Sequence, residues 1–81
     1  MSLQELKTGK IAVGIKQSSK AVLSGEAKKV FIASDAEVFV IRNLLQLTKE
    51  YNVPVEDVDT MKELGQACGI NINAASAVIY K

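Results

Sequence analysis

The centre of the chain, residues 29–48, has the sequence KVFIASDAEVFVIRNLLQLT. Its first part, residues 29–33, is a nearly continuous run of apolar, β-favouring side chains, which is typical of a strand covered on both faces. The second part carries a stripe of side chains at helical spacing, made of Val38, Ile41, Leu44, Leu45 and Thr48. A buried strand followed at once by an amphipathic helix predicts an α/β fold with a central sheet.

The same alternation of helix and strand continues on both sides of this stretch. The expected helices cover residues 2–8, the segment between Gly14 and Gly25, the segment between Ser34 and Asn52, and residues 60–68; the expected strands cover residues 10–13, 29–33, 53–58 and 74–80. Strands that alternate with helices imply helices on both faces of the sheet. We therefore expect a single domain over residues 1–81, a three-layer α/β/α sandwich around a four-stranded sheet. The sheet is expected to be mixed, since the last strand need not run parallel to the others.

The composition excludes most enzyme and metal chemistry. The 81 residues include no histidine and one cysteine, Cys68, which excludes an internal disulfide, a zinc cluster and a Ser–His–Asp arrangement. Cys68 lies among apolar neighbours and is expected in the core. No apolar run is long enough to span a bilayer, and residues 1–10 lack the apolar core of a signal peptide. We expect a cytoplasmic protein without cofactor, metal, membrane contact or enzymatic activity.

One expected helix begins differently from the other three. Those three open on capping boxes, in which a hydroxyl and a carboxylate satisfy free backbone N–H groups: Ser2 with Glu5, Ser34 with Glu37, and Thr60 with Glu63. The helix after Gly14 has no such box and carries Lys16 and Lys20, a like-charge pair at the positive end of the helix dipole. This start suggests a site for a polyanion. The alternative is that both lysines are simply solvated on an exposed helix face.

Charge is distributed unevenly along the chain, although the formal net charge is only +1. Residues 1–29 hold six lysines and two glutamates, a net charge of +4, whereas residues 30–81 hold four basic and seven acidic residues, a net charge of −3. A small bipolar domain commonly presents its basic side to an anionic partner. The alternative is that the charges mix on the surface once the chain folds.

Two motifs together resemble a known family. They are Gly14-Ile15-Lys16-Gln17-Ser18-Ser19-Lys20 and Leu64-Gly65-Gln66-Ala67-Cys68-Gly69-Ile70, and between them lie the Ser24-Gly25 helix stop and a Val30–Asp35 segment that ends in an acid. The chain resembles, over essentially its whole length, the kink-turn-binding ribosomal proteins of the L-seven-Ae type, and its length fits the small bacterial, YbxF-like branch. The resemblance implies the same three-layer sandwich and the binding of kink-turns, which are RNA bends containing tandem sheared G·A pairs.

The resemblance also implies which residues contact RNA at the first motif. The family reads the sheared G·A pairs with the positions held here by Lys16 and Gln17, where archaeal and eukaryotic members have Asn-Glu and the bacterial branch is similar to this sequence. Lys16 can donate to guanine O6 and N7. Gln17 keeps an acceptor for a guanine N–H but lacks the charge of glutamate, so that affinity or selectivity can differ from the archaeal proteins. Gly14 would let the backbone approach the RNA, and Lys20 would hold phosphate.

At the second motif, the resemblance implies that a loop of Ile70, Asn71, Ile72 and Asn73 covers unpaired bases at the bend. The alternative is that the two isoleucines lead into the last strand and pack inward. Two further residues have two explanations each. Asp35 is close to RNA in the family, but it can equally cap a helix. Lys28 can extend the contact with phosphates, or it can simply flank a buried strand.

These observations favour a non-enzymatic, monomeric RNA-binding protein that recognises kink-turns in ribosomal or other structured RNA. One alternative is a protein-interaction or ribosome-assembly accessory domain with weak RNA affinity. Another is a nucleotide-binding α/β domain, which is disfavoured because Gly14 is followed by Ile15-Lys16 and no phosphate loop of the Gly-Lys-Ser/Thr kind is present.

Overall fold

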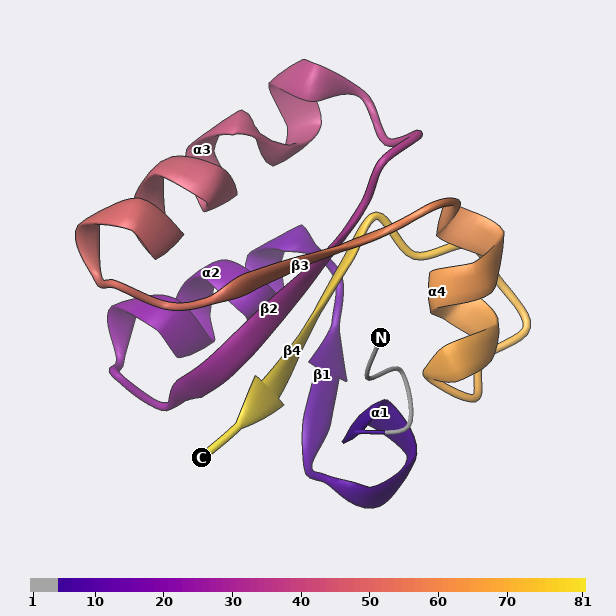
Figure 1. Ribbon diagram of the computed structural model, residues 1–81, viewed down its shortest axis with the longest axis horizontal. Coiled ribbons are helices and arrows are strands. Elements are labelled where there is room, and N and C mark those ends of the chain that lie inside the picture. The colour runs from indigo at the N-terminus through magenta and orange to yellow at the C-terminus, as the bar shows by residue number, and fades with distance from the viewer. Residues whose placement is uncertain (1–4) are drawn as a thin grey trace.

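The computed structural model describes residues 5–81, in which helices and strands alternate strictly (Figure 1). In chain order the elements are α1 (Glu5–Thr8), β1 (Ile11–Val13), α2 (Ile15–Leu23), β2 (Ala27–Ala33), α3 (Val38–Glu50), β3 (Val55–Val58), α4 (Met61–Ala67) and β4 (Ser76–Tyr80). The predicted order of elements is confirmed, with strand and helix ends displaced by a few residues. The predicted capping box of Ser2 and Glu5 is not tested, because Ser2 lies outside the described residues.

The strands form one mixed sheet in the order β1-β4-β2-β3. Strand β4 lies antiparallel to both β1 and β2, whereas β3 is parallel to β2. The parallel pair is joined through α3, as a crossover connection requires. The last strand therefore runs against its neighbours and makes the sheet mixed, as predicted.

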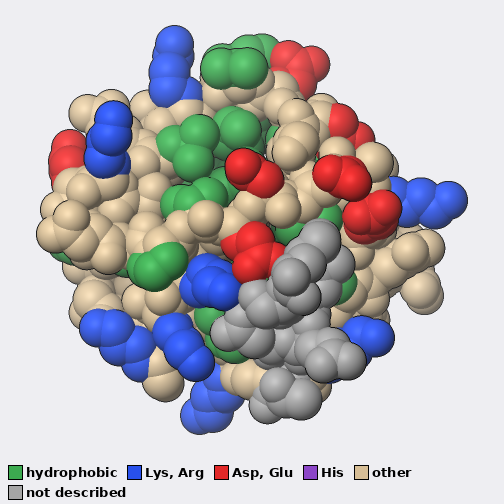
Figure 2. Space-filling view, in the orientation of Figure 1, with side chains coloured by type: hydrophobic (Ala, Val, Ile, Leu, Met, Phe, Trp, Pro, Cys, Tyr) green, Lys and Arg blue, Asp and Glu red, His purple; other side chains and the backbone are tan. Residues whose placement is uncertain are grey.

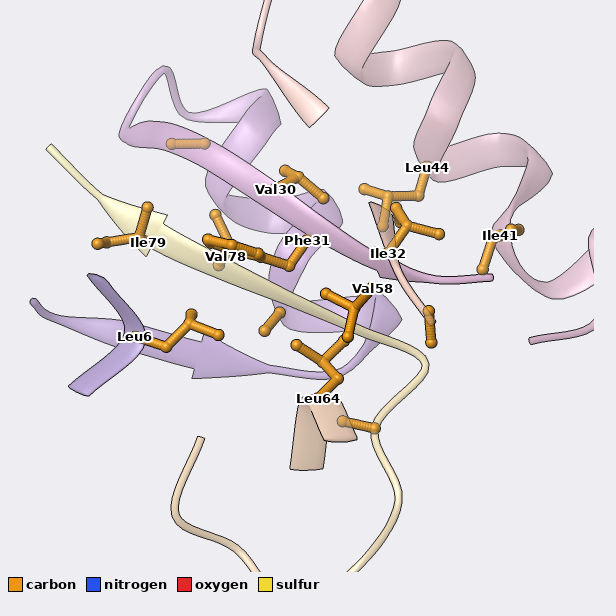
Figure 3. Close-up of a cluster of buried hydrophobic side chains, with 14 of the residues drawn as sticks. Leu6, Val30, Phe31, Ile32, Ile41, Leu44, Val58, Leu64, Val78 and Ile79 are labelled. Atoms are coloured by element: carbon orange, nitrogen blue, oxygen red, sulfur yellow. The ribbon is translucent and has the colours of Figure 1, made fainter. Parts of the chain in front are cut away.

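Helices cover both faces of the sheet, which confirms the three-layer sandwich. On one face α2 packs against α3 and contacts β1, β2 and β4; on the other α4 contacts β2, β3 and β4 (Figure 1). Because side chains alternate along a strand, β2 supplies both layers of the core. Ile32 lies beside Ile41 and Leu44 of α3, and Val58 of β3 lies beside Leu64 of α4 (Figure 3). Residues 30–33 are all buried, as the apolar run predicted.

In the sequence, Ile15, Ser19, Val22 and Leu23 lie at helical spacing and predict the inner stripe of this helix, but the buried face of α2 is different. The buried residues are Ser18, Ala21 and Val22, while Leu23 is 54% exposed. The helix is rotated so that Ser18, rather than Ser19, meets β4, where its hydroxyl lies 3.1 Å from that of Ser76. A buried pair of hydroxyls satisfies both partners, so a polar residue can occupy the centre of this face.

The predicted capping box at Ser34 and Glu37 is wrong. Helix α3 begins at Val38 with Glu37 as its N-cap residue, and no side chain caps it. The reason is that Ser34 continues the sheet: its N–H donates to the carbonyl oxygen of Val58 at 2.7 Å. Helix α3 therefore begins at Val38, later than predicted, and Val38 and Phe39 are exposed in its first turn. At α4 the hydroxyl half of the predicted box is present, since Thr60 Oγ1 accepts from the N–H of Glu63 at 3.0 Å.

Candidate nucleic-acid interface

One end of the molecule gathers the connections that contain most of the predicted RNA-binding residues. Strands β1, β2 and β3 end there, β4 begins there, and α2, α3 and α4 start there (Figure 1). The sheet register brings the segments together, because Ser76 at the start of β4 pairs with Ile32 near the end of β2. The N–H of Gly14 donates to the carbonyl oxygen of Ser76 at 2.9 Å. The start of α2 is thus fixed to the end of the loop that precedes β4.

Gly14 forms the start of α2 in a backbone conformation that glycine alone adopts readily. Its φ is 105° and its ψ is 159°, in a region that is essentially restricted to glycine. No side chain caps the helix, so the first N–H groups, those of Ile15 to Gln17, are left without intrahelical partners. Lys16, Gln17 and Lys20 are exposed around this start. The first turn of α2 therefore presents unpaired N–H groups and the ammonium group of Lys16 to the outside, and Lys20 adds a second ammonium group one turn later.

The loop of residues 70–73 is held against α4 by backbone contacts. The N–H of Ile70 donates to the carbonyl oxygen of Gly65 at 3.1 Å, and the N–H of Ala74 donates to that of Met61 at 3.0 Å. A Cβ on Gly65 would overlap the carbonyl oxygen of Ile72, so the close approach of loop and helix requires glycine. In the sequence Gly65 stands out only as part of a motif, and the steric requirement for glycine at this position is not visible there.

The two isoleucines of this loop have different environments. Ile70 is half-buried and packs against the core, as its inward-packing alternative proposed. Ile72 is 72% exposed, and Asn71 and Asn73 are exposed beside it. Of the two apolar side chains, Ile72 is therefore the one that is available to cover a base.

A shallow hollow of about 230 Å³ lies between this loop and α4. Besides residues 70–73 it is lined by Lys62 and Gln66, neither of which was predicted to belong to the site. Their spacing of four residues places them on the same helix face, and this spacing is the feature of the sequence that could have identified them. Lys62 adds a cation to the loop side of the interface. We refer to Gly14, Lys16, Gln17, Lys20, Lys62, Gln66 and residues 70–73 as the candidate interface.

Asp35 lies in the turn between β2 and α3, at the same end of the molecule. Its Oδ1 accepts a hydrogen bond of 2.8 Å from the N–H of Met61, the first residue of α4. It therefore satisfies the start of a helix, as the capping alternative proposed, but the helix is α4 and not the one that follows in sequence. Its carboxylate is exposed and lies beside the candidate interface.

Lys28 is not brought together with the other predicted residues. It lies near the start of β2, five residues before Ala33, which corresponds to about 16 Å along a strand. It is exposed at the end of the sheet where β4 terminates, since Ala27 pairs with Tyr80. A role for Lys28 in RNA binding stays a prediction, but not as part of the candidate interface.

Acidic and basic side chains are more intermixed on the surface than their distribution along the sequence suggests. Acidic side chains gather over β3 and α4, while several Lys and Arg side chains gather over the end of the sheet near the C-terminus (Figure 2). Of α2, α3 and α4, which all start at this end of the molecule, α3 has Glu37 as its N-cap residue and α4 has Glu63 in its first turn. Helix α2 has no acid in its first turn. Neither an acid nor a capping side chain offsets the helix dipole at its N-terminus, which therefore suits an external anion.

Other kinds of site receive no support from residues 5–81. No group of three or more His, Cys, Asp or Glu among them is placed to hold a metal ion. Burial raises the pKa of the half-buried Cys68 thiol, which disfavours the reactive thiolate. None of the helices in this part of the chain has the length and apolar character needed to cross a membrane. The hollow of about 650 Å³ between α3 and β3 contains none of the predicted site residues.

The sequence of the chain identifies its family. A sequence profile of the ribosomal protein L7Ae/L30e/S12e/Gadd45 family matches residues 2–81, and the chain belongs to that family. The RNA-binding protein YbxF of Geobacillus stearothermophilus is 43% identical over 76 residues, which are 94% of this chain and 93% of the relative. The RNA-binding protein TTE2299 of Caldanaerobacter subterraneus is 44% identical over 68 residues, covering 84% and 83% of the two chains.

Solved structures agree with this assignment. The 15.5kD RNA binding protein of Giardia lamblia superimposes with a TM-score of 0.88 at 26% identity, over 98% of this chain and 67% of that protein. A protein of unknown function from Bacillus halodurans superimposes with a TM-score of 0.84 at 26% identity, over 96% of this chain and 78% of that protein. The resemblance drawn from the two sequence motifs is thereby confirmed.

Proposed function

We propose that this protein is a non-enzymatic RNA-binding protein that recognises kink-turns through the candidate interface. One observation carries the proposal: the uncapped N-terminus of α2, with Lys16 and Lys20, is fixed by the Gly14–Ser76 hydrogen bond to the segment that follows the loop of residues 70–73, in which residues 71–73 are exposed. The names of the relatives, several of which are RNA-binding proteins, and the family assignment support it.

In this proposal the two parts of the interface have different tasks. Lys16 donates to the O6 and N7 atoms of a guanine, and Gln17 accepts from a guanine N–H, in the opened groove of the bend. Lys20 and the first N–H groups of α2 hold phosphates. Ile72 covers an unstacked base while Asn71 and Asn73 contact nearby polar groups. The protein acts in the cytoplasm as a monomer, on ribosomal or other structured RNA.

The test compares a kink-turn RNA with the same RNA lacking its tandem G·A pairs and with a plain duplex. Binding should be tightest to the intact kink-turn, because a regular duplex hides its base edges in a deep, narrow groove. Exchange of Lys16 for Ala should weaken binding to the kink-turn by about 1–3 kcal/mol, the usual value of a good base-edge contact. Lys49→Ala, at an exposed lysine on α3 outside the interface, is the matched control. Equal affinity for the three RNAs at physiological salt would overturn the proposal.

The alternative, a protein-interaction or ribosome-assembly accessory domain, is favoured by a separate observation. Val38 and Phe39 in the first turn of α3 are 73% and 66% exposed, and the next residue, Val40, is also exposed. Consecutive exposed apolar side chains are characteristic of protein contacts. A partner that binds without RNA, is insensitive to salt, and is lost on Phe39→Ser exchange would support this alternative over the kink-turn proposal.

A further inference from the structure

The end of the sheet opposite to the candidate interface carries a second group of lysines. Lys10, Lys28 and Lys81 are all exposed there, and we call these three residues the distal patch. Backbone hydrogen bonds bring them together from three segments: the N–H of Tyr80 donates to the carbonyl oxygen of Lys10 at 2.9 Å, and the N–H of Lys81 donates to that of Glu26 at 2.9 Å. Tyr80 also pairs with Ala27, the neighbour of Lys28. With adjacent strands about 4.8 Å apart, Lys10 and Ala27 on either side of Tyr80 are separated by about 10 Å.

The patch borders a hollow with an aromatic side chain. The hollow has a volume of about 160 Å³ and lies between the turn after α2 and the turn after α3. Its lining includes Lys28, Lys81, Tyr51 and Asn52, and Tyr51 is 45% exposed. A tyrosine ring next to two ammonium groups is the combination with which proteins bind unpaired nucleotides, because the ring stacks on a base and the cations attract its phosphates.

The acid beside the patch, Glu26, forms no ion pair with these lysines. In the described part of the chain, no carboxylate side chain forms an ion pair with Lys28 or Lys81, and the Glu26 carboxylate accepts from the Ser24 hydroxyl at 3.0 Å. Lys29, the neighbouring cation, is engaged instead with Glu56 at 3.3 Å and lies over the ring of Phe31. The register between β2 and β4 is irregular between Ala27 and Lys29, so Lys28 sits at a break in the ladder.

We infer that the distal patch and Tyr51 bind single-stranded RNA that flanks the structured RNA held at the candidate interface. The inference rests on the proposed RNA-binding function and adds a second contact at the opposite end of the molecule. Unpaired nucleotides fit better than a duplex. A shallow hollow beside a single aromatic ring can receive one extruded base, whereas the paired bases of a duplex cannot enter it. The 29 Å length of the molecule is short enough for a flanking strand to reach from one end to the other.

A competing explanation is that the lysines only complement the negative ends of α2 and α3, which point toward this end of the molecule. The two explanations differ in their consequences. If the lysines are purely structural, their removal lowers the melting temperature and leaves RNA binding unchanged. If they bind RNA, the affinity for flanking nucleotides changes while that for the kink-turn alone does not.

The experiment compares a minimal kink-turn RNA with the same RNA carrying a single-stranded oligouridine extension long enough to cross the molecule. For the unmodified protein the extension should tighten binding by about fivefold or more, the effect of stacking one base on an aromatic ring. Tyr51→Ala and Lys28→Ala should remove most of this gain and leave the affinity for the minimal RNA unchanged, which also shows that the variants are folded. Tyr51→Phe should retain it.

Lys49→Ala is the matched control, because it removes the same charge from the end of α3 without touching the hollow. Binding of the minimal RNA without any gain from the extension would overturn this inference alone. A gain that falls equally in Lys49→Ala and Lys28→Ala would also overturn it, since the attraction would then be diffuse. Failure to bind even the minimal kink-turn would overturn the proposed function and this inference with it.

Discussion

Lys16 occupies a position that helix energetics disfavour. It is exposed in the first turn of α2, one turn before Lys20, and the helix has neither a capping side chain nor an acid in its first turn. Both the helix dipole and the second lysine repel its ammonium group. Lys16 lowers local stability but lies on a surface otherwise suited to RNA. Such a residue is expected where selection has acted on binding rather than on folding.

Replacement of Lys16 by Glu should therefore separate stability from function. Stability should stay unchanged or rise by up to about 1 kcal/mol, because a carboxylate is favourable at the start of a helix. Kink-turn binding should be nearly abolished, since an anion would face phosphates and guanine acceptors. Thermal melting and an RNA titration of the same sample measure the two effects. If Lys16→Glu unfolded the domain, Lys16 would be a structural residue and its assignment to the interface would be wrong.

Gly65 has a steric role that a single added methyl group tests. Alanine there would push against the carbonyl oxygen of Ile72, so the loop must move away from α4. We expect a loss of about 1–3 kcal/mol in the free energy of unfolding, as for other overpacked sites, together with weaker kink-turn binding.

Gly69→Ala is a useful comparison for Gly65→Ala. Gly69 has a φ of 78° but open space where a Cβ would be, so alanine strains the backbone without pressing on the loop carbonyl. Chemical denaturation and RNA titration of both variants check the prediction. An equal loss of RNA affinity in the two variants would show that the contact between Gly65 and Ile72 has no particular role in shaping the interface.

At the level of elements, the starts of helices are stabilised by neighbours that are distant in sequence. Asp35, in the turn after β2, accepts from the first N–H of α4, while Ser34 extends the pairing of β2 with β3. Likewise, Ser18 of α2 is joined to Ser76 of β4 at the centre of the fold. These contacts connect the elements whose ends make up the candidate interface.

Asp35→Ala should cost about 1 kcal/mol of stability, the usual effect of losing a helix-capping acceptor. Asp35→Asn keeps an acceptor oxygen and should restore most of that loss. Denaturation curves of the two variants measure this difference. If both variants kept full stability but bound kink-turn RNA differently from the unmodified protein, the carboxylate would act on RNA rather than on α4.

The Ser18–Ser76 pair predicts a non-additive result. Both side chains are fully buried, so Ser18→Ala leaves the Ser76 hydroxyl without its partner and should cost about 1–3 kcal/mol. The double exchange of both serines for alanine should cost less than the sum of the single exchanges, because no buried hydroxyl then lacks a partner. A double-mutant cycle by chemical denaturation provides the test. Simple additivity would mean that the two hydroxyls do not depend on each other.

At the scale of the whole molecule, exposed lysines are distributed over two opposite ends. The candidate interface holds three lysines, Lys16, Lys20 and Lys62, with acidic residues close by, whereas the distal patch holds three more. Contact with a minimal kink-turn should therefore involve only a few ammonium groups, and specificity should depend more on base contacts than on net charge.

The salt dependence of binding measures this distribution. For a minimal kink-turn, the slope of log Kobs against log salt concentration should be no steeper than about −3, at roughly 0.9 per neutralised phosphate. Lys20→Ala should make the slope shallower by about one unit, whereas Lys28→Ala should leave it unchanged. Titrations at several salt concentrations provide the measurement. A slope much steeper than −3 would mean that the distal lysines also contact the minimal RNA.

The sequence by itself determined the architecture, because the signals that specify it are local. Continuous apolar residues at 30–33 identify a strand buried on both faces. Of the stripe predicted for α3, Ile41, Leu44 and Thr48 form its inner face, whereas Val38 and Leu45 are exposed and were wrongly assigned to it. The absence of histidine excludes whole classes of chemistry regardless of the fold. Both motifs of the family were also recognisable from residue types and spacing alone, and the family assignment agrees with them.

Only the tertiary structure decided which residues meet. The partner of Asp35 is 26 residues away, Ser18 rather than Ser19 faces β4, and the close contact of Gly65 is with a loop that turns back on its helix. Lys28 has the same charge as Lys16 but lies at the opposite end of the sheet. These outcomes depend on strand direction, register and helix rotation, which long-range packing sets. Local spacing carries no information on them, because the same periodicity is compatible with either strand direction and with several rotations of a helix.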